Sequence, residues 1–296
     1  MKITVTGSLG NISKPLAEKL IRAGHQVTII SSNKDRVAEI EALGAKAAIG
    51  SVEDGAFLTG AFRGADVVYT MAPPNFKAAN YRQYITGTGH HYAAAIQAAG
   101  VKRVVNLSSI GAHLPDGTGP VAGLHGVEQI LNKLEGVSIL HLRPAFFYTN
   151  FYRNVDMIKT AGFLGANYGE DSTIVLVHTE DIADAAAEEI QRPFTGTGVR
   201  YVVSDERTGT EIASVIGAAI GKPGLKWVEF TDEQALNGMI QAGLLEDHAK
   251  NYVELNAAAR SGILFEEYYS NKPLEPVKRK FEQFATEFAS AYLSAL

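Results

Sequence analysis

The sequence predicts an α/β fold in which a mostly parallel sheet is covered by helices on both faces. Short runs rich in Val and Ile alternate with stretches of helical periodicity through the first 150 residues. A strand, a glycine turn and a helix open the chain at Lys2. Glycines end several of the helical stretches and are soon followed by the next strand. Strands that alternate with helices in this way form βαβ units with buried, parallel strands.

The expected elements follow one another without long interruptions. Gly24, Gly44, Gly64 and Gly100 each end a helical stretch, where glycine tolerates the left-handed conformation after the last turn. Two successive βαβαβ halves make a doubly wound parallel sheet of the Rossmann type. We expect strands at 3–6, 26–30, 45–49, 66–70, 103–107 and 137–142, and helices at about 11–23, 34–43, 54–63, 76–99 and 121–134.

After residue 150 the alternation changes. The segment 151–177 is irregular and rich in Gly, Tyr and Asn, whereas a helix at 180–191 and a strand at 199–204 return to the sheet. We therefore expect a Rossmann domain at 1–150 that 178–205 rejoins. A smaller, mainly helical substrate lobe follows from 151–177 and 206–272, and a C-terminal helix lies within 273–296. The lobe is expected over the carboxyl ends of the strands, where open α/β sheets bind ligands.

Composition excludes several classes of function. Lys and Arg number 27 against 32 Asp and Glu, for a net charge of -5, so we expect no nucleic-acid partner, which would require a clustered basic face. The chain has no Cys, which excludes disulfides and thiolate chemistry. No apolar run approaches the roughly 18 residues that span a bilayer, and the strand at Lys2 leaves no room for a signal peptide. We expect a cytoplasmic protein without a membrane partner.

The stretch from Ile3 to Ser13 is the most informative part of the chain. It is a strand followed by Thr6-Gly7-Ser8-Leu9-Gly10-Asn11-Ile12, and then a helix. Gly7 permits the sharp turn out of the strand, and Gly10 lets the backbone approach a pyrophosphate. The unpaired N–H groups and the dipole of the following helix favour an anion. Ser13 stands at the third glycine position, which governs packing. The pattern predicts a nicotinamide dinucleotide, although a glycine turn without a ligand is the alternative.

The end of the second strand indicates which dinucleotide is bound. An acidic residue there usually holds the ribose 2′-hydroxyl of NAD, but this chain reads Ile30-Ser31-Ser32-Asn33-Lys34-Asp35-Arg36. No carboxylate occupies the strand end, and donors suited to a 2′-phosphate are present at Ser31, Ser32, Asn33, Lys34 and Arg36. NADP(H) is therefore preferred, with NAD(H) still open. The alternative is that Lys34 and Arg36 are solvated residues at the start of a helix.

Several stretches together resemble the NmrA-like branch of the atypical short-chain dehydrogenase/reductases, over residues 1 to about 205. They are Thr6–Gly10, Tyr69–Pro74, Val101–Ser109, Leu124–Glu128, Leu142–Pro144 and His178–Ala183. The resemblance implies that Gly7 to Ile12 hold the pyrophosphate and Ser31 to Arg36 the adenosine ribose. It implies that Glu53 and Asp54 lie near the adenine, although Ser51 stands at the commoner aspartate position. Met71, Ala72 and Pro73 would lie near the nicotinamide-side ribose, and Ser108, Ser109 and Pro144 around the nicotinamide.

Catalytic residues are harder to assign. The wider superfamily reduces carbonyls with a Tyr-x-x-x-Lys pair on the helix after the fifth strand, but residues 121–130 contain no tyrosine. His125 on that helix is the best proton donor, unless it only bonds a neighbouring carbonyl. Ser108 could polarise a carbonyl or serve only the cofactor, and Tyr148 could be an acid or, like other aromatic residues of its segment, a pocket wall.

Other motifs are interpreted as structural. The distant Tyr268…Lys272 pair lies outside the expected helix and is interpreted as chance. His178 is expected to begin a helix. His90 and His91 point about 100° apart on a helix, so we expect no metal site there.

Three functions remain open. The first is an oxidoreductase that transfers hydride from NADPH to a quinone or conjugated carbonyl, whose product anion is stabilised without a strong protein acid. The second is a non-catalytic NADP(H)-sensing regulatory protein. The third is an NAD-dependent sugar epimerase or dehydratase, which is disfavoured because that chemistry needs the missing tyrosine. We expect a small-molecule substrate and either a monomer or a homodimer.

Overall fold

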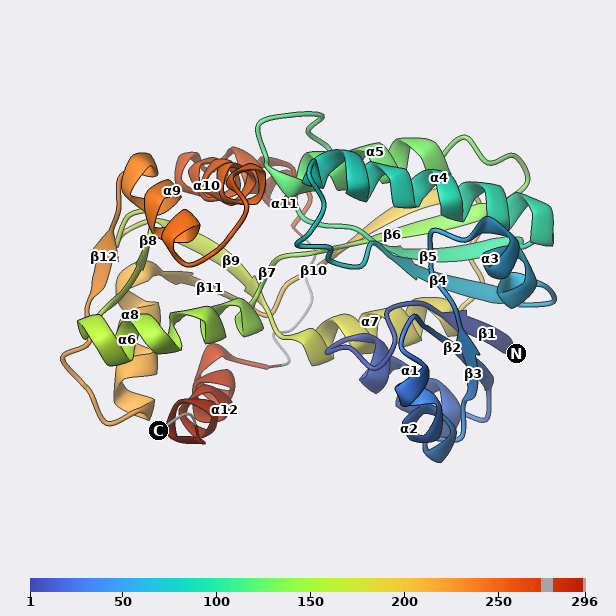
Figure 1. Ribbon diagram of the computed structural model, residues 1–296, viewed down its shortest axis with the longest axis horizontal. Helices are drawn as coiled ribbons and strands as arrows, with labels where there is room; N and C mark the ends of the chain where they lie inside the picture. Colours follow the sequence, from blue (N-terminus) through green and yellow to red (C-terminus); the bar gives the residue numbers. More distant parts are fainter. Residues whose placement is uncertain (273–278, 295–296) are drawn as a thin grey trace.

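The computed structural model describes residues 1–272 and 279–294. Within these residues the main sheet has seven strands, all parallel, in the order β10-β6-β5-β4-β1-β2-β3 (Figure 1). The chain winds outward from β1 in both directions, so the predicted doubly wound Rossmann-type sheet is confirmed. The strands are β1 (Lys2–Val5), β2 (Gln26–Ser31), β3 (Lys46–Ile49), β4 (Val67–Met71), β5 (Arg103–Leu107), β6 (Ser138–Pro144) and β10 (Thr197–Val202).

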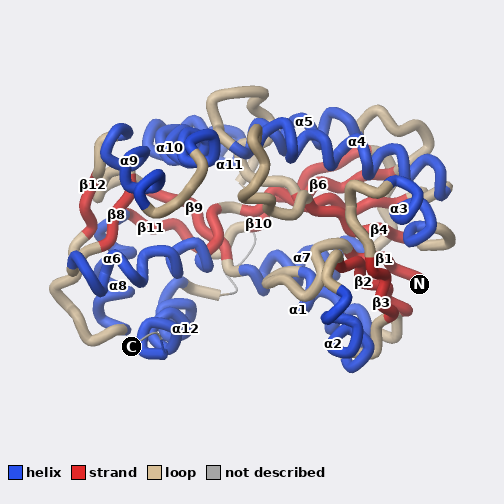
Figure 2. Tube along the Cα trace, viewed as in Figure 1, coloured by secondary structure: helices blue, strands red, loops and turns tan. Residues whose placement is uncertain are grey.

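Helices cover both faces of this sheet. One layer holds α3 (Gly55–Phe62), α4 (Tyr81–Ala99) and α5 (Pro120–Leu131). The opposite layer holds α1 (Ser13–Arg22), α2 (Val37–Ala42), which the short 3-10 helix η1 (Lys34–Arg36) precedes, and α7 (Thr179–Gln191). Figure 2 shows the strands between these two helical layers. Side chains alternate between the layers: Tyr69 packs with the core under α1 and α7, and its neighbour Val68 with the core under α4 and α5.

The contact between α4 and α5 depends on glycine. A Cβ atom added at Gly89 would lie 3.1 Å from the Cα of Val127, and one at Gly123 would lie 3.0 Å from the carbonyl oxygen of Arg82. Both distances are shorter than nearly all real Cβ contacts, so the two helix backbones approach too closely for a side chain. This packing fixes α5, and with it His125 and Glu128, against the sheet.

The rest of the chain forms a second group of elements at one end of the sheet (Figure 1). The segment expected to be irregular, 151–177, instead carries much of it, and two small sheets, β11-β9-β7 and β12-β8, join the expected helices. These strands have two to five residues, too few for a clear periodicity in the sequence. The elements are β7 (Phe146–Phe147), the 3-10 helix η2 (Tyr148–Asn154), α6 (Val155–Ala161), β8 (Leu164–Ala166), β9 (Thr173–Val177), β11 (Asp205–Thr208), α8 (Gly209–Ala219), β12 (Trp227–Glu229), α9 (Asp232–Gln241), α10 (Glu246–Ser261), the 3-10 helix η3 (Ile263–Phe265), α11 (Glu266–Ser270) and α12 (Phe281–Ser294).

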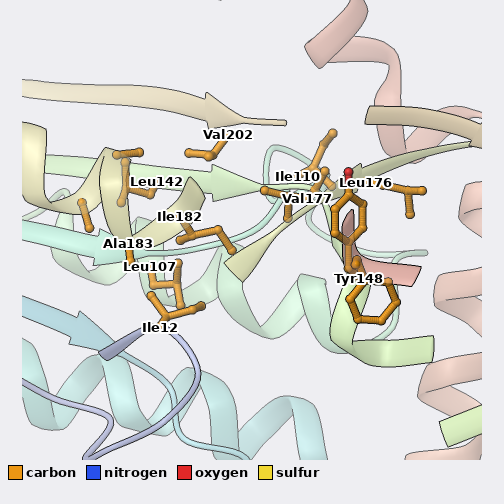
Figure 3. Packing of buried hydrophobic residues seen from close by; sticks show 14 of the residues in the cluster. Ile12, Leu107, Ile110, Leu142, Tyr148, Leu176, Val177, Ile182, Ala183 and Val202 are labelled. Atoms are coloured by element: carbon orange, nitrogen blue, oxygen red, sulfur yellow. The ribbon is translucent and has the colours of Figure 1, made fainter. Parts of the chain in front are cut away.

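One hydrophobic core connects the sheet with this second group. It runs from Ile12 beside the first turn through Leu107 and Val177 to Tyr148, as Figure 3 shows. The same cluster contains Phe281, Phe284 and Phe288 of α12. The lobe proposed from the sequence therefore shares its core with the Rossmann domain. Of the predicted C-terminal helix, residues 273–278 and 295–296 lie outside the described residues.

Two further observations bear on the sequence predictions. Helix α4 begins at Tyr81 rather than at 76, because the side chain of Asn80 caps it by accepting a hydrogen bond from the Gln83 amide at 2.9 Å. The residues before it, with Pro73 and Pro74, form a loop. In the described part of the chain, no helix has the length and apolar character needed to cross a membrane.

Candidate functional site

The turn after β1 has the geometry that its glycines predict. Gly7 has a φ of 91°, and a Cβ added there would lie 2.4 Å from the Ser13 hydroxyl oxygen. That hydroxyl donates a hydrogen bond to the Thr6 carbonyl at 2.8 Å, which ties α1 to the end of β1. Ser13 therefore fits the close packing that the third glycine would serve. A Cβ at Gly10 would lie 3.1 Å from the Gly7 carbonyl oxygen, so a side chain there would crowd the turn.

Free amide groups gather at the start of α1. Ile12 is the N-cap of this helix and provides no side-chain cap, and the first turn carries no acidic residue. In the part of the chain that the structure describes, the amides of Asn11, Ile12 and Ser13 donate no hydrogen bond. Gly10 and Asn11 are exposed. Unpaired amides at an open helix N-terminus favour an anion, so the residues present fit a pyrophosphate.

The end of β2 lies directly against this turn. Ser31 is buried, and its hydroxyl accepts hydrogen bonds from the Ser8 hydroxyl at 2.9 Å and from the Asn33 amide at 3.2 Å. Ser32 and Asn33 are exposed. Ser31 therefore supports the turn. Asn33 caps η1 by accepting from the Asp35 amide at 2.9 Å, so Ser32 and the Nδ2 group of Asn33 remain open to a ligand. No carboxylate lies at the strand end, as the sequence indicates.

A carboxylate approaches from the next helix instead. The Arg36 guanidinium lies 2.6 Å from Glu39 on α2, and this hydrogen bond holds the pKa of the Glu39 carboxyl below its usual value. Lys14 of α1 lies 3.6 Å from the same carboxylate. Arg36 is therefore partly neutralised in the structure. The spacing of three residues on a helix was the available signal for this pair.

Residues expected near the nicotinamide-side ribose come together with the turn. The Met71 amide donates to the Thr6 hydroxyl at 3.0 Å, and the Met71 carbonyl accepts from the Tyr92 hydroxyl at 2.7 Å. The Met71 side chain also lies beside Gly7. Ala72 and Pro73 follow, half-buried, at the carboxyl end of β4. The carboxyl ends of β1 and β4 thus lie side by side, with Met71 in contact with Thr6 and Gly7.

The residues expected around the nicotinamide lie on the two neighbouring strand ends. The Ser108 amide donates to the Leu142 carbonyl at 2.8 Å, and the Ile110 amide donates to the Pro144 carbonyl at 2.9 Å. The Ser109 hydroxyl donates to the Ile110 carbonyl at 2.9 Å. Ser108, Ser109 and Pro144 are therefore adjacent. The sequence places them together because parallel strands end at the same edge of the sheet.

The Ser108 hydroxyl has a different partner from the one expected. It is buried and donates to Glu128 of α5 at 2.5 Å. Glu128 in turn accepts from Arg143 of β6, whose Nε lies 3.0 Å from Oε1 and whose Nη2 lies 2.7 Å from Oε2. The hydroxyl is thus committed to a buried ion pair, so the structure does not support Ser108 as a group that polarises a substrate carbonyl.

His125 is held against the loop after β5. Its Nδ1 lies 2.9 Å from the Ala112 carbonyl oxygen and donates to it, and the ring is half-buried. A hydrogen bond to a neighbouring carbonyl was the alternative raised from the sequence. It fixes the tautomer and leaves Nε2 as the second functional atom of the ring.

Tyr148 faces away from this surface. Its hydroxyl donates to the Arg279 carbonyl at 3.0 Å, and its ring contacts His178 and Phe281 with centroid separations of 5.7 and 5.1 Å. Burial raises the pKa of its phenol above the ordinary value. The prediction that Tyr148 is a catalytic acid is therefore not supported: the side chain belongs to the aromatic core, as Figure 3 shows.

The remaining candidates are structural. His178 caps α7, where its Nδ1 accepts from the Glu180 amide at 3.1 Å. Tyr268 and Lys272 both contact Glu206 of β11, at 3.2 and 2.5 Å, and lie outside α5. Asp54 caps α3 through the Ala56 and Phe57 amides. Among residues 1–272 and 279–294, no three His, Asp or Glu side chains gather as metal ligands.

The comparisons with known proteins agree with this geometry. Residues 1–275 match the model of the NmrA-like family. The chain belongs to this family. One relative, an NAD(P)H azoreductase of Xenophilus azovorans, is 26% identical to this chain over 298 residues. The alignment spans 99% of this chain and 100% of the relative. A reductase of (4-alkanoyl-5-oxo-2,5-dihydrofuran-3-yl)methyl phosphate from Streptomyces griseus is 28% identical and covers 75% of this chain and 74% of its own length.

Solved structures share the fold of this NmrA-like chain. An NADPH-dependent quinone oxidoreductase of Escherichia coli, in complex with NADPH, superimposes with a TM-score of 0.81 and 20% identity. The alignment covers 96% of this chain and 99% of that one. The triphenylmethane reductase of Citrobacter has a TM-score of 0.79 and 18% identity, over 98% of this chain and 100% of its own.

Proposed function

We propose that this protein is an NADPH-dependent reductase of small, electron-poor conjugated molecules such as quinones. The observation that carries the proposal is the turn after β1, where Gly7 and Gly10 leave space and the amides of Asn11, Ile12 and Ser13 are free at the start of α1. This geometry fits a diphosphate. The proposal gains support from a relative named NAD(P)H azoreductase, which aligns with 99% of the chain.

NADPH is favoured over NADH by the end of β2. Ser32 and Asn33 are exposed there, and Arg36 lies on the following turn. A 2′-phosphate would compete with Glu39 for the Arg36 guanidinium, and a phosphate carries more negative charge than the Glu39 carboxylate. A 2′-hydroxyl would meet no carboxylate at the strand end, so NADH would lose the contact that usually holds it.

Bound NADPH would supply the hydride, because hydride chemistry belongs to the cofactor. The protein would orient it between the ends of β4, β5 and β6, through the backbone of Met71 and the loop that carries Ser109. A quinone that gains a hydride and then a proton becomes a hydroquinone. Its intermediate anion is delocalised, so the reaction does not require a strongly acidic tyrosine. Water would deliver the proton, or His125 Nε2 would first take up a proton from water and pass it on, because the Nδ1 proton is held by the Ala112 carbonyl.

A non-catalytic NADP(H) sensor is the second candidate, and one observation favours it. Helix α5 carries no tyrosine, and the hydroxyl of Tyr148, the tyrosine considered as an acid, already donates to the Arg279 carbonyl. Such a protein would bind the cofactor through the same turn without turnover. An epimerase or dehydratase is disfavoured for the same reason, because a tyrosine base is needed for that chemistry.

Turnover distinguishes the two candidates. The purified protein is mixed with NADPH and a series of quinones, and the loss of cofactor absorbance is compared with that in a mixture without protein. Reduction well above the protein-free rate supports the reductase. Tight NADPH binding in calorimetry with no turnover of any quinone supports the sensor, and absence of binding removes both.

A further inference from the structure

Three segments meet in a cluster of aromatic rings and one cation near the carboxyl end of the sheet. Phe76 lies in the loop after β4, Arg153 lies in η2, which follows β6 and β7, and Tyr252 lies on α10. The guanidinium carbon of Arg153 lies 6.0 Å from the centre of the Phe76 ring and 5.2 Å from that of Tyr252. Both β4 and β6 end where the nicotinamide is expected, so this cluster borders the proposed reaction site.

Phe76 is the outer member of a stack of rings. Its ring centre lies 6.4 Å from that of Tyr81 and 6.0 Å from that of His248, and the Tyr81 and His248 rings are 4.3 Å apart. Tyr81 and His248 are buried, whereas Phe76 is 49% exposed. The stack therefore ends in an aromatic ring that no other part of the fold fully covers.

Hydrogen bonds hold the loop that carries Phe76. His248 Nε2 donates to the Ala78 carbonyl at 2.8 Å, and the Tyr81 amide donates to the Asp247 carboxylate at 2.8 Å. Both partners on the other side belong to α10. The backbone of the loop beside the exposed ring is therefore held before any ligand arrives, which lowers the entropy cost of binding to this loop.

Arg153 is exposed and keeps its charge available. In the part of the chain that the structure describes, it forms no ion pair and no hydrogen bond, and its guanidinium lies against two aromatic rings. Arg82, on the neighbouring helix α4, differs: it is paired with Asp116 and Glu254. A guanidinium stacked on rings can still accept an anionic group in the plane of its N–H donors.

We infer that Phe76, Arg153 and Tyr252 form a subsite for a flat aromatic substrate that carries a negative charge, such as an aryl sulfonate or carboxylate. The substrate ring stacks on Phe76 and its anionic group pairs with Arg153. Aromatic stacking tolerates many ring systems, whereas the guanidinium selects those with an anion. This inference rests on the proposed reductase function and adds the substrate class.

The test compares two quinones that differ by one charged group. Steady-state rates with NADPH are measured for 1,2-naphthoquinone and 1,2-naphthoquinone-4-sulfonate. In Arg153→Gln the KM for the sulfonate rises about tenfold, a change that corresponds to the loss of one charge-assisted contact. The KM for the neutral quinone stays within about twofold and kcat is unchanged. Arg153→Lys, which keeps the charge, restores part of the affinity. Equal effects on both quinones, or none on either, would overturn the inference.

Two controls complete the experiment. Arg22→Gln removes an exposed charge at the end of α1 and leaves both KM values unchanged. Phe76→Ala raises the KM for both quinones, because stacking does not depend on the sulfonate. Calorimetric binding of 2-naphthalenesulfonate to the NADPH complex needs no turnover. If no quinone is reduced but this anion binds and Arg153→Gln weakens it, the proposed function fails while the subsite stands; if wild type and Arg153→Gln bind it equally, the subsite fails.

Discussion

The carboxylate of Glu128 accepts two hydrogen bonds from the guanidinium of Arg143, and both side chains are almost excluded from water, with 3% and 7% of their side-chain surface exposed. Burial opposes the charge on Arg143, but its hydrogen bonds with Glu128 outweigh this effect and raise its pKa above the ordinary value. The pair joins α5 to β6, and the Ser108 hydroxyl binds the same carboxylate. Arg143 also reaches Glu267 of α11 at 2.5 Å.

The first prediction concerns this pair. Arg143→Met leaves the buried Glu128 carboxylate without a cation and should cost about 3–5 kcal/mol of unfolding free energy. Glu128→Leu should cost less, because Arg143 keeps its ion pair with Glu267. The double variant should lose less than the sum of the two, because no lone charge remains. Urea unfolding of the four proteins measures both quantities. Single variants that lose less than about 1 kcal/mol, or strictly additive losses, would contradict a coupled buried pair.

The second prediction concerns pH. His141 lies in β6, fully buried, where its Nδ1 accepts from Asn106 at 3.1 Å and its Nε2 donates to Asn132 at 2.8 Å. The Thr70 hydroxyl fixes the Asn106 amide. Burial lowers the pKa of His141 from 6.5, and Arg143 adds to this while Glu128 opposes it. Both ring nitrogens are therefore satisfied only in the neutral form.

Proton linkage determines the direction in which the stability changes with pH. Below pH 6.5 the unfolded chain takes up a proton at His141 that the folded chain does not, so unfolding becomes easier as the pH falls. The unfolding free energy that neutral His141 contributes is fully present above that pH. Below it, this free energy changes by at most about 1.4 kcal/mol per pH unit. Between about pH 7.5 and pH 5.5, stability should fall more steeply in the wild type than in His141→Gln. His90→Gln, a change on the exposed surface of α4, is the control and should keep the wild-type slope.

Much of the local geometry of the proposed dinucleotide site could be predicted because its determinants are close together in the sequence. Gly7, Gly10 and Ser13 lie within one turn, and the structure places each where its size matters. The meeting of Met71 with this turn follows from the order of parallel strands, which βαβ alternation already indicates. The position of Met71 relative to this turn can therefore be predicted from the sequence.

The catalytic side of the site could not be predicted in the same way. Whether Ser108 faces a ligand depends on Glu128 and Arg143, which are 20 and 35 residues away in the chain. The direction of Tyr148 depends on Arg279 and Phe281, more than 130 residues away. A charged residue within the buried strand β6, Arg143, was the available signal that a buried partner was needed.

The third prediction tests the phosphate turn. Gly10→Val should abolish NADPH binding, because its side chain would crowd the Gly7 carbonyl and occupy the space over the free amides. Circular dichroism and the unliganded Tm report whether the fold survives. NADPH at about 100 times its Kd should stabilise the wild type by about 2.7 kcal/mol and the variant by nothing. Gly60→Ala is the matched control, since a Cβ there meets nothing within 4 Å, and it should retain the full NADPH shift. Retained affinity in Gly10→Val would remove the proposed cradle.

The last prediction concerns the preference for NADPH over NADH. This preference should depend on the competition between the 2′-phosphate and Glu39 for Arg36. Arg36→Gln removes a donor for the 2′-phosphate and should weaken NADPH binding about threefold to tenfold, a modest effect because the site is exposed and screened. Glu39→Gln should act in the opposite direction. It releases Arg36 from the hydrogen bond that now holds it, so NADPH should bind about threefold more tightly at low salt.

Calorimetry with NADPH and NADH separates an effect on the contact with the 2′-phosphate from an effect on dinucleotide binding in general. NADH affinity should stay nearly constant in both variants, because a 2′-hydroxyl offers no charge to Arg36. Glu41→Gln removes an exposed carboxylate from the same helix and should change neither affinity, which controls for net charge. Added salt should shrink the gain in Glu39→Gln, since the contacts are exposed. If NADPH and NADH respond equally to Arg36→Gln, this arginine does not read the 2′-phosphate, and the preference must come from Ser32, Asn33 or Lys34.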